Sequence, residues 1–282
     1  MTWVLLRGLT REARHWGALL GQPAQDGKLA RQLARQLARQ LEQPGGPAAA
    51  APVVALDLPG NGEFFKMRSP LSVRGMVDFA REQLRARGIG PPYQLVAMSL
   101  GGMVATDWAQ QYPDEVSRLV LINTSMRPYS RAMERLRPGN WLPFALALRA
   151  ARWPSAASQA YAERLIHQLT CKRIDTRDDD LAAWGRIRQS APVSAANALR
   201  QLWAAALFCS APTPPRCPAL VLSSAADRLV DPQCSARVAA AWLAPHYRHP
   251  WAGHDLPHDD AGWVSERIAV WLGAGAKAAS LL

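Results

Sequence analysis

Short apolar runs alternate with longer amphipathic stretches along much of the chain. The amphipathic stretches repeat their apolar residues with a helical period and lie at residues 72–87, 100–112, 235–243 and 261–272. The first of them opens with Ser72, a residue type that caps helices. The apolar runs have the length and flanking turn residues of buried strands, and they lie at residues 3–6, 53–58, 93–98, 118–123 and 219–223. A further short strand is predicted at residues 247–251. This alternation predicts an α/β fold, with a mostly parallel sheet and helices on both of its faces.

The pattern changes between residues 126 and 212. This stretch has no convincing strand, but it has helical periodicity and several tryptophans. Strand–helix alternation resumes after a Pro-rich linker at residues 210–218. We therefore predict an α/β core made of residues 1–125 and 213–282, interrupted by an all-helical cap of residues 126–212.

A low-complexity repeat, ARQLARQLARQL, fills residues 30–41. Its leucines recur every four residues and line one face of a predicted helix. Arg31, Arg35 and Arg39 give that helix a basic character, which is also found in helices that lie on membranes or bind partners. We favour the simpler interpretation, a helix that covers one side of the sheet.

Length and composition are those of a globular protein. Of the 282 residues, 49% are hydrophobic and 20% are charged, which excludes a disordered chain, and 19 glycines are too few for collagen. No apolar stretch approaches the ~18 residues that a membrane-spanning helix needs. The first ten residues also lack the pattern of a secretory signal. We therefore expect no stable membrane insertion and a cytoplasmic location.

The charge is strongly positive, with 33 Lys and Arg residues against 22 Asp and Glu residues, a formal net charge of +11. A basic surface is typical of proteins that bind nucleic acid. Here, however, the arginines are spread along the chain and are not interleaved with aromatic residues. We predict no nucleic-acid partner, although an anion-binding protein remains an alternative.

The cysteines give no sign of a metal or redox site. No pair has the close spacing of a zinc site or a C-x-x-C motif, and the number is too small for a disulfide scaffold. No cluster of histidines and carboxylates in the sequence suggests a metal either. We predict neither metal nor cofactor, and a reducing environment for the cysteines, which are Cys171, Cys209, Cys217 and Cys234.

The segment at residues 95–104, LVAMSLGGMV, carries the strongest chemical signal. A buried strand runs into a helix, with Ser99 at the join, Ala97 two residues before it and Gly101 two residues after it. Such an elbow projects the hydroxyl above the sheet and leaves room only for small neighbours. The helix that follows also points its first amides towards developing negative charge. The simpler alternative is a serine that caps a helix.

Two further residues follow strands later in the chain. Asp227 comes after the strand at 219–223, and His254 comes after the strand at 247–251. Because the carboxyl ends of parallel strands meet at one edge of the sheet, Ser99, Asp227 and His254 are expected to converge there. Asp231 is the rival acid. Of the other histidines, we predict surface positions for His258 and His15, and the remaining rivals of His254 are His246 and His249.

The chain resembles the α/β-hydrolase fold superfamily, in particular its esterase- and lipase-like members with a helical lid. The resemblance rests on the serine elbow, the order Ser, acid, His, and the segment DLPGNG at residues 57–62. Two features depart from the family: Ala97 replaces a glycine, and Arg7-Gly8 stands where His-Gly is usual. The chain also begins at what would be the family's third strand, so we expect a sheet without one or two edge strands.

The roles follow from the chemistry of such a triad. Ser99 is the nucleophile, His254 takes its proton, and Asp227 orients the imidazole and stabilises its charged form. The oxyanion hole is expected from the backbone N–H groups of Leu100 and Leu9.

Three further residues are candidates for contacts with the substrate. Trp184 and Trp203 are candidates for an apolar acyl pocket, although most tryptophans of helices pack in cores. Arg7 has two interpretations, an anchor for an anionic substrate or a partner in a structural salt bridge, and we favour the second.

These residues predict a serine hydrolase that cleaves a carboxylic ester or a thioester of a small molecule through an acyl-enzyme. One alternative is an enzyme of the same fold with other chemistry: amide or peptide cleavage, C–C bond hydrolysis, acyl transfer or cofactor-free peroxidation. Another is a non-enzymatic ligand- or anion-binding protein. Fold alone does not choose between them.

Overall fold

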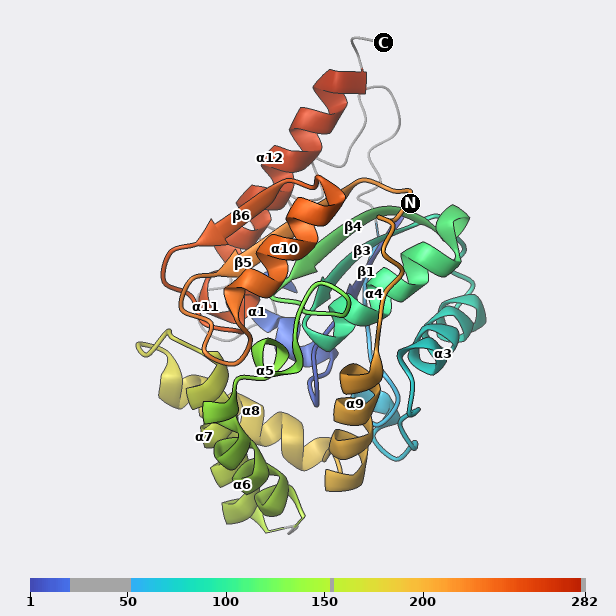
Figure 1. The fold of residues 1–282 in the computed structure, drawn as a ribbon. Coiled ribbons are helices and arrows are strands. Elements are labelled where there is room, and N and C mark those ends of the chain that lie inside the picture. Colours follow the sequence, from blue (N-terminus) through green and yellow to red (C-terminus); the bar gives the residue numbers. More distant parts are fainter. Residues whose placement is uncertain (21–51, 153–154, 280–282) are drawn as a thin grey trace.

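A six-stranded parallel sheet forms the centre of the molecule (Figure 1). The computed structural model describes residues 1–20, 52–152 and 155–279. The strand order is β2-β1-β3-β4-β5-β6, and all neighbouring strands are parallel. The six strands lie where the sequence predicted them, with ends that differ by at most two residues: β1 Thr2–Leu6, β2 Val53–Leu56, β3 Tyr93–Met98, β4 Val116–Ile122, β5 Ala219–Ser224 and β6 His246–His249.

Each face of the sheet has its own apolar core, because alternate residues of a strand point to opposite faces. On one face, Val4, Leu95 and Leu119 pack against α3 (Val73–Ala86), α4 (Leu100–Gln111) and α10 (Pro232–Trp242). On the other face, Leu5 and Val96 pack against the N-terminal helical turns η1 (Ala13–Trp16) and α1 (Gly17–Leu20) and against α11 (Leu256–Asp259) and α12 (Ala261–Ala279). The inner strands β1, β3, β4 and β5 are largely buried on both sides, which explains why they read as continuous apolar runs.

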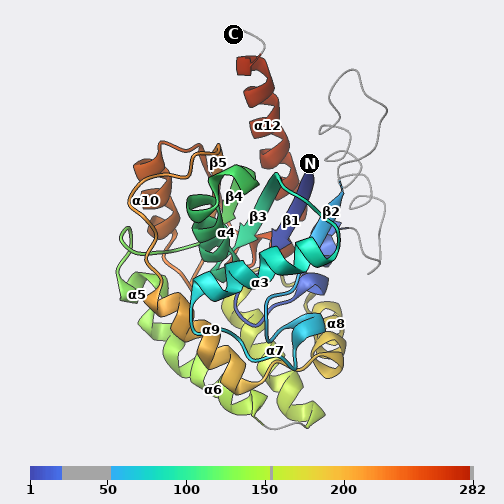
Figure 2. The ribbon, with the colours of Figure 1, turned by 90° about the vertical axis from the view of Figure 1, so that its right-hand side faces the viewer.

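The predicted core helices are confirmed, with two differences at their ends. The Ser72 side chain accepts a hydrogen bond from the Gly75 amide and so begins α3 as expected. Helix α10 begins three residues before the prediction, because Asp231 caps it and Pro232 fits the first helical position. Helix α12 is longer than predicted, and its last turns extend beyond the sheet (Figure 2). The predicted helix at residues 30–41 lies outside the described residues.

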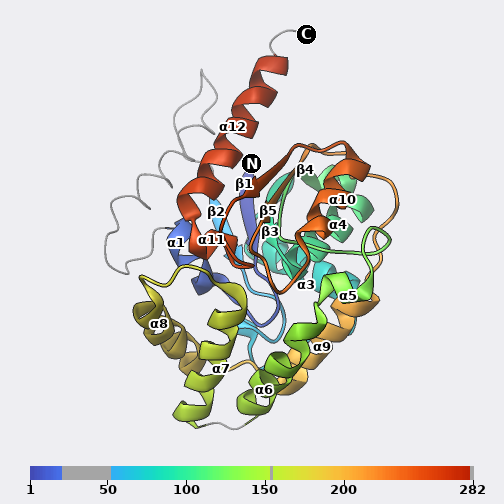
Figure 3. The same ribbon diagram turned by 60° about the vertical axis from the view of Figure 1, so that its left-hand side comes forward.

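Between β4 and β5 the described residues form helices joined by loops, and their strand-like pairing is one isolated bridge between Arg127 and Cys209. These helices lie across one end of the sheet (Figures 1 and 3). The boundaries 126 and 212 of a cap domain stay a prediction. The five helices are α5 Ala132–Arg135, α6 Trp141–Ala151, α7 Ala156–Thr170, α8 Arg177–Ser190 and α9 Ala195–Leu207.

None of the helices in the described part of the chain combines the length and the hydropathy that crossing a membrane requires.

Candidate active site

Ser99 lies at the join of β3 and α4 in a strained backbone conformation, with φ 54° and ψ −118°. Such a conformation costs on the order of 1–3 kcal/mol for a residue with a side chain and persists only where its surroundings enforce it. Here the Ser99 amide donates to the Ile122 carbonyl over 3.0 Å, and the Ser99 carbonyl accepts from the Thr124 hydroxyl over 2.9 Å. The strand on one side and the neighbouring loop on the other thus fix the turn.

The two residues after Leu100 are glycines because neighbouring segments lie too close for a Cβ atom. A Cβ atom on Gly101 would lie 2.3 Å from the Leu6 carbonyl oxygen, and one on Gly102 would lie 2.6 Å from the Thr124 hydroxyl oxygen. Either contact would push α4 away from the neighbouring segment. Gly101, which the sequence analysis singled out, therefore has a steric cause, the approach of α4 to the end of β1, and Gly102 leaves room for Thr124 after β4.

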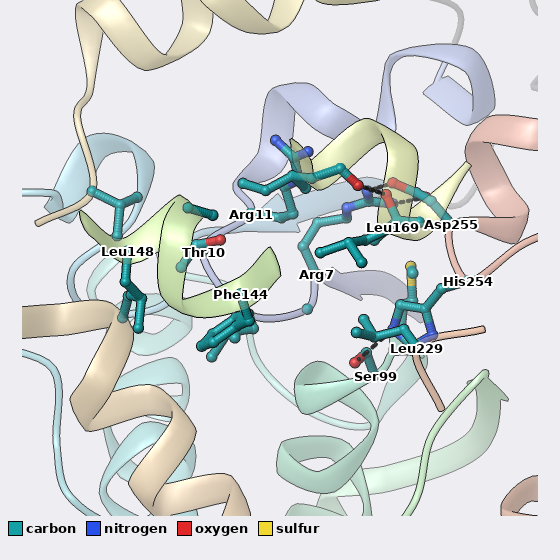
Figure 4. Close-up of a pocket in the computed structure, with 18 of the residues that line it drawn as sticks. Arg7, Thr10, Arg11, Ser99, Phe144, Leu148, Leu169, Leu229, His254 and Asp255 are labelled. Atoms are coloured by element: carbon teal, nitrogen blue, oxygen red, sulfur yellow. Dashed lines mark hydrogen bonds and ion pairs between the residues drawn. The ribbon is translucent and has the colours of Figure 1, made fainter. Parts of the chain in front are cut away.

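The side chains of Ser99, His254 and Asp227 form one hydrogen-bonded chain. His254 Nε2 lies 3.0 Å from Ser99 Oγ (Figure 4). His254 Nδ1 lies 2.7 Å from Asp227 Oδ2. An ionised carboxylate only accepts hydrogen bonds, so Nδ1 carries the proton and Nε2 accepts from the serine hydroxyl. The structure thus brings together the three residues that the sequence singled out.

Backbone contacts hold the acid and the histidine in place. The second oxygen of Asp227 accepts from the amides of Leu229, over 2.9 Å, and Val230, over 3.0 Å. The Asn123 side chain donates to the His254 carbonyl oxygen over 2.8 Å. Both Asp227 and His254 are buried. These contacts hold the imidazole in the orientation in which its Nε2 atom faces Ser99 Oγ.

The rivals of Asp227 and His254 have other partners. Asp231 caps α10 and pairs with Arg137 over 3.2 Å. His249 bonds to Asp260 over 3.2 Å, and His246 bonds to the Ser223 hydroxyl over 2.8 Å. None of these three groups contacts Ser99.

Two histidines that were predicted at the surface lie inside, and the prediction is wrong for both. His258 is partly buried, with its Nε2 3.0 Å from Asp180 Oδ2. His15 is buried in η1 with its ring edge-on to Trp184. Both rings are covered by the helical segment between β4 and β5, whose packing the local pattern does not reveal.

A cavity with mostly apolar walls opens beside Ser99 and His254 (Figure 4). Helix α6 contributes Phe144 and Leu148, and α7 contributes Ile166 and Leu169. Leu229 from the loop after β5 completes the side next to the histidine. The sequence analysis missed these wall residues; the apolar repeat of the two helices is their only local signal.

The two tryptophans expected in an acyl pocket do not line this cavity. Trp203 is 56% exposed on α9, and Trp184 is buried beneath the guanidinium of Arg11, 4.1 Å from its ring centre. That part of the prediction is wrong, because Trp184 packs against Arg11 and Trp203 faces outward.

The two expected oxyanion donors lie near the serine. Leu100 is the first residue of α4, where amides have no acceptor within the helix. Leu9 lines the cavity, and it follows Gly8, which is packed against the Ser99 side chain.

Arg7 forms a buried two-pronged salt bridge with Asp255, the residue after His254. The two contacts measure 3.1 and 2.6 Å, and the guanidinium also stacks on the Trp16 ring. Burial alone would raise the pKa of the Asp255 carboxyl, but the charge and hydrogen bonds of Arg7, together with the charges of His258 and Arg11, outweigh burial, so the pKa lies below its usual value. Of the two interpretations of Arg7, the structural salt bridge is confirmed. It joins the loop after β1 to the loop that carries His254.

A second buried ion cluster lies behind the cavity. Glu163 of α7 accepts from Arg11 over 2.8 Å and also pairs with Arg188 of α8. Burial favours the protonated acid, but the two arginines outweigh it and lower the pKa of Glu163. This cluster ties α7 and α8 to the N-terminal loop.

With this architecture, the chain belongs to the alpha/beta hydrolase fold family, whose sequence model matches residues 21–261.

Curated relatives match only part of the chain. Over 72 residues the chain is 40% identical to the pimeloyl-[acyl-carrier protein] methyl ester esterase of Chromobacterium violaceum, a match that covers 26% of each protein. Over 87 residues it is 31% identical to the homoserine O-acetyltransferase of Citrifermentans bemidjiense, covering 30% of this chain and 24% of the relative. The chain thus spans about a quarter of the length of these relatives.

Among solved structures, the enol-lactonase from Burkholderia xenovorans is similar, with a TM-score of 0.69 and 18% sequence identity. The match covers 96% of this chain and 91% of that one. At this identity the likeness demonstrates the fold.

Proposed function

We propose that the protein is a serine hydrolase that cleaves a carboxylic ester or thioester of a small molecule through an acyl-enzyme. One observation carries the proposal: the bonded chain from Ser99 Oγ through His254 to Asp227, with distances of 3.0 and 2.7 Å, beside an apolar cavity. This arrangement has the order and contacts of a nucleophile, a base and the group that orients the base.

In the first half-reaction, His254 Nε2 takes the hydroxyl proton while Ser99 Oγ attacks the carbonyl carbon. Asp227 stabilises the imidazolium that forms. The amides of Leu100 and Leu9 donate to the oxyanion, and each such donor lowers the barrier by about 2.7–4 kcal/mol. The imidazolium then protonates the leaving alkoxide or thiolate, which departs and leaves the acyl group on Ser99.

In the second half-reaction, His254 takes a proton from water, and the resulting hydroxide attacks the acyl-enzyme. Collapse of the intermediate releases the acid and returns the proton to Ser99. The walls from α6 and α7 favour an apolar acyl group, since burial contributes roughly 25 cal/mol per Å² of apolar surface.

Acyl transfer is a second candidate, and the partial match to a homoserine O-acetyltransferase favours it. The first half-reaction is the same. An alcohol in place of water then attacks the acyl-enzyme, so the product is an ester and not an acid.

The test is labelling with a fluorophosphonate probe, followed by turnover of p-nitrophenyl esters of increasing chain length. We expect the wild-type protein to react and Ser99→Ala to be inert. Ser190→Ala, which changes an exposed serine of α8, is the matched control and should react like wild type. Equal labelling of wild type and Ser99→Ala would refute the proposal. Adding a primary alcohol separates the two candidates, because only acyl transfer yields the new ester in preference to the acid.

A further inference from the structure

Three side chains with metal-binding atoms meet where α7 and α11 come together. They are His167, Cys171 and His258, and their nitrogen and sulfur atoms all lie within 4.8 Å of one another. His167 lies in the last turn of α7 and Cys171 is its C-cap, so the two share one face of the helix. His258 belongs to α11, on the other side of the junction.

Asp180 of α8 adds an oxygen next to both histidines. Its Oδ2 atom lies 3.0 Å from His258 Nε2 and 3.7 Å from His167 Nε2. In a tetrahedral zinc site with bonds of 2.0–2.1 Å, neighbouring ligand atoms are roughly 3.3 Å apart. The two observed separations lie on either side of that value, whereas the ligand atoms of His167, Cys171 and His258, within 4.8 Å of one another, would have to move closer on binding.

His167 has an unsatisfied nitrogen within this cluster. Its Nε2 atom is buried and makes no hydrogen bond to any described residue, and the side chain is 4% exposed. Buried polar atoms nearly always have a partner, so an orphan of this kind calls for an explanation. The Trp184 ring packs against both histidines, with centroids 5.3 and 4.9 Å away, and shields the cluster. A bound ion would satisfy the nitrogen without any solvent.

We propose that His167, Cys171, His258 and Asp180 together bind one zinc ion. The donor set of two imidazoles, one thiolate and one carboxylate suits zinc, whereas calcium and magnesium prefer oxygen ligands alone. On binding, the Cys171 thiol releases its proton to solvent and the thiolate sulfur coordinates the metal. Four protein ligands leave no open position, which makes the ion structural and not catalytic.

The position of the site indicates the structural role that the ion would have. The ion would join α7 and α8 to α11, which begins two residues after His254. The same junction already holds the Asp255 amide against the Thr170 carbonyl over 2.8 Å, and the Asp259 carboxylate against the amide of Lys172 over 2.9 Å. Zinc would therefore fix the helical segment over the loop that carries the histidine. The proposal stands on the ligand cluster alone and does not depend on the hydrolase activity.

The experiment is a titration of the chelator-treated full chain with Co²⁺ and with Zn²⁺. We expect Co²⁺ to saturate at one equivalent and to give the visible bands of a tetrahedral ion together with a thiolate charge-transfer band. Zn²⁺ should displace it and raise the Tm. Cys171→Ser should lose the charge-transfer band, and His167→Gln should bind at least about tenfold more weakly. Cys209→Ser changes an exposed cysteine outside the cluster and should behave as wild type.

Several results would overturn the assignment. One is the absence of saturable Co²⁺ binding by the wild-type protein. This measurement does not depend on the folding of any variant. Another is an unchanged cobalt spectrum in Cys171→Ser, or a loss in Cys209→Ser as large as that in Cys171→Ser. Ser99→Ala should bind the ion as tightly as wild type, so a failure of the proposed hydrolase chemistry and a failure of the metal site are read out separately.

Discussion

At the scale of single residues, hydrogen bonds distinguish Asp227 from Asp231, two acids that hold similar positions in the sequence. Asp227 and Asp231 both follow β5 and lie four positions apart. Only Asp227 has its carboxylate on His254, while Asp231 caps α10. The local pattern cannot distinguish them, because the distinction depends on where the loop after β6 returns.

The two acids therefore predict different effects of the same substitution. Asp227→Asn should lower kcat on the order of 10⁴-fold, because an amide at this position favours the wrong imidazole tautomer. Asp231→Asn should leave kcat within a few-fold, since Asn caps helices as well as Asp does. Steady-state kinetics on the best p-nitrophenyl ester compare the two variants. A larger loss in Asp231→Asn would move the acid of the triad to position 231.

At the scale of elements, the loops after β1 and β6 are joined by the pair of Arg7 and Asp255. Both side chains are almost completely buried, at 1% and 2% exposure. A charge in such a place is stable only while its partner remains. The sequence suggested a salt bridge for Arg7 but offered no partner, because the acid is distant in the chain and the two meet only across the folded sheet.

Replacing one residue of this pair should lower the free energy of unfolding more than replacing both. Asp255→Leu is expected to lower the free energy of unfolding by about 3–5 kcal/mol, because it strands the Arg7 charge in the interior. The double variant Arg7→Leu/Asp255→Leu should recover most of that loss. Urea unfolding of the single variants, the double variant and wild type forms the double-mutant cycle. Additive losses would contradict the expected coupling.

At the scale of the whole molecule, helices between β4 and β5 lie over the end of the sheet that carries Ser99 and His254 (Figure 3). Besides apolar contacts, buried ion pairs hold this layer to the core: Glu163 bonds Arg11 of the N-terminal loop. Asp255 pairs with Arg7 and so joins two loops at the same end of the sheet. The stability of the whole therefore depends on buried carboxylates that must stay ionised.

That dependence predicts a loss of stability in acid. Asp255 and Glu163 have pKa values below those of an unfolded chain, so the unfolded state binds their protons more readily. Their contribution is fully present above the unfolded pKa, about 4, and is lost as the pH falls from there towards the folded values. The free energy of unfolding, measured by urea titration at several pH values, should fall across that window. In Arg7→Leu/Asp255→Leu the fall should be smaller; an identical fall in both proteins would contradict the role of Asp255.

The fold, Ser99 and the chain order serine, acid, histidine were predictable because their signals are local. Strands buried on both faces are mostly apolar, and the elbow needs Gly101 for contact with the backbone of Leu6. The cavity wall was not predictable in the same way. Phe144 lines it whereas Trp203 does not, and the difference lies in how α6 and α9 turn against the sheet.

The amino-acid sequence by itself determined the strands, the helices that cover them, and the order in which Ser99, Asp227 and His254 reach one edge of the sheet. Periodicity and chain order carry that information, since each strand ends at the same edge as its parallel neighbours. Only the tertiary structure decided which partners Arg7 and Glu163 find and how His167, Cys171 and His258 meet. Those contacts join segments far apart in the chain, and the packing of whole helices, not the residues next to them, sets their distances.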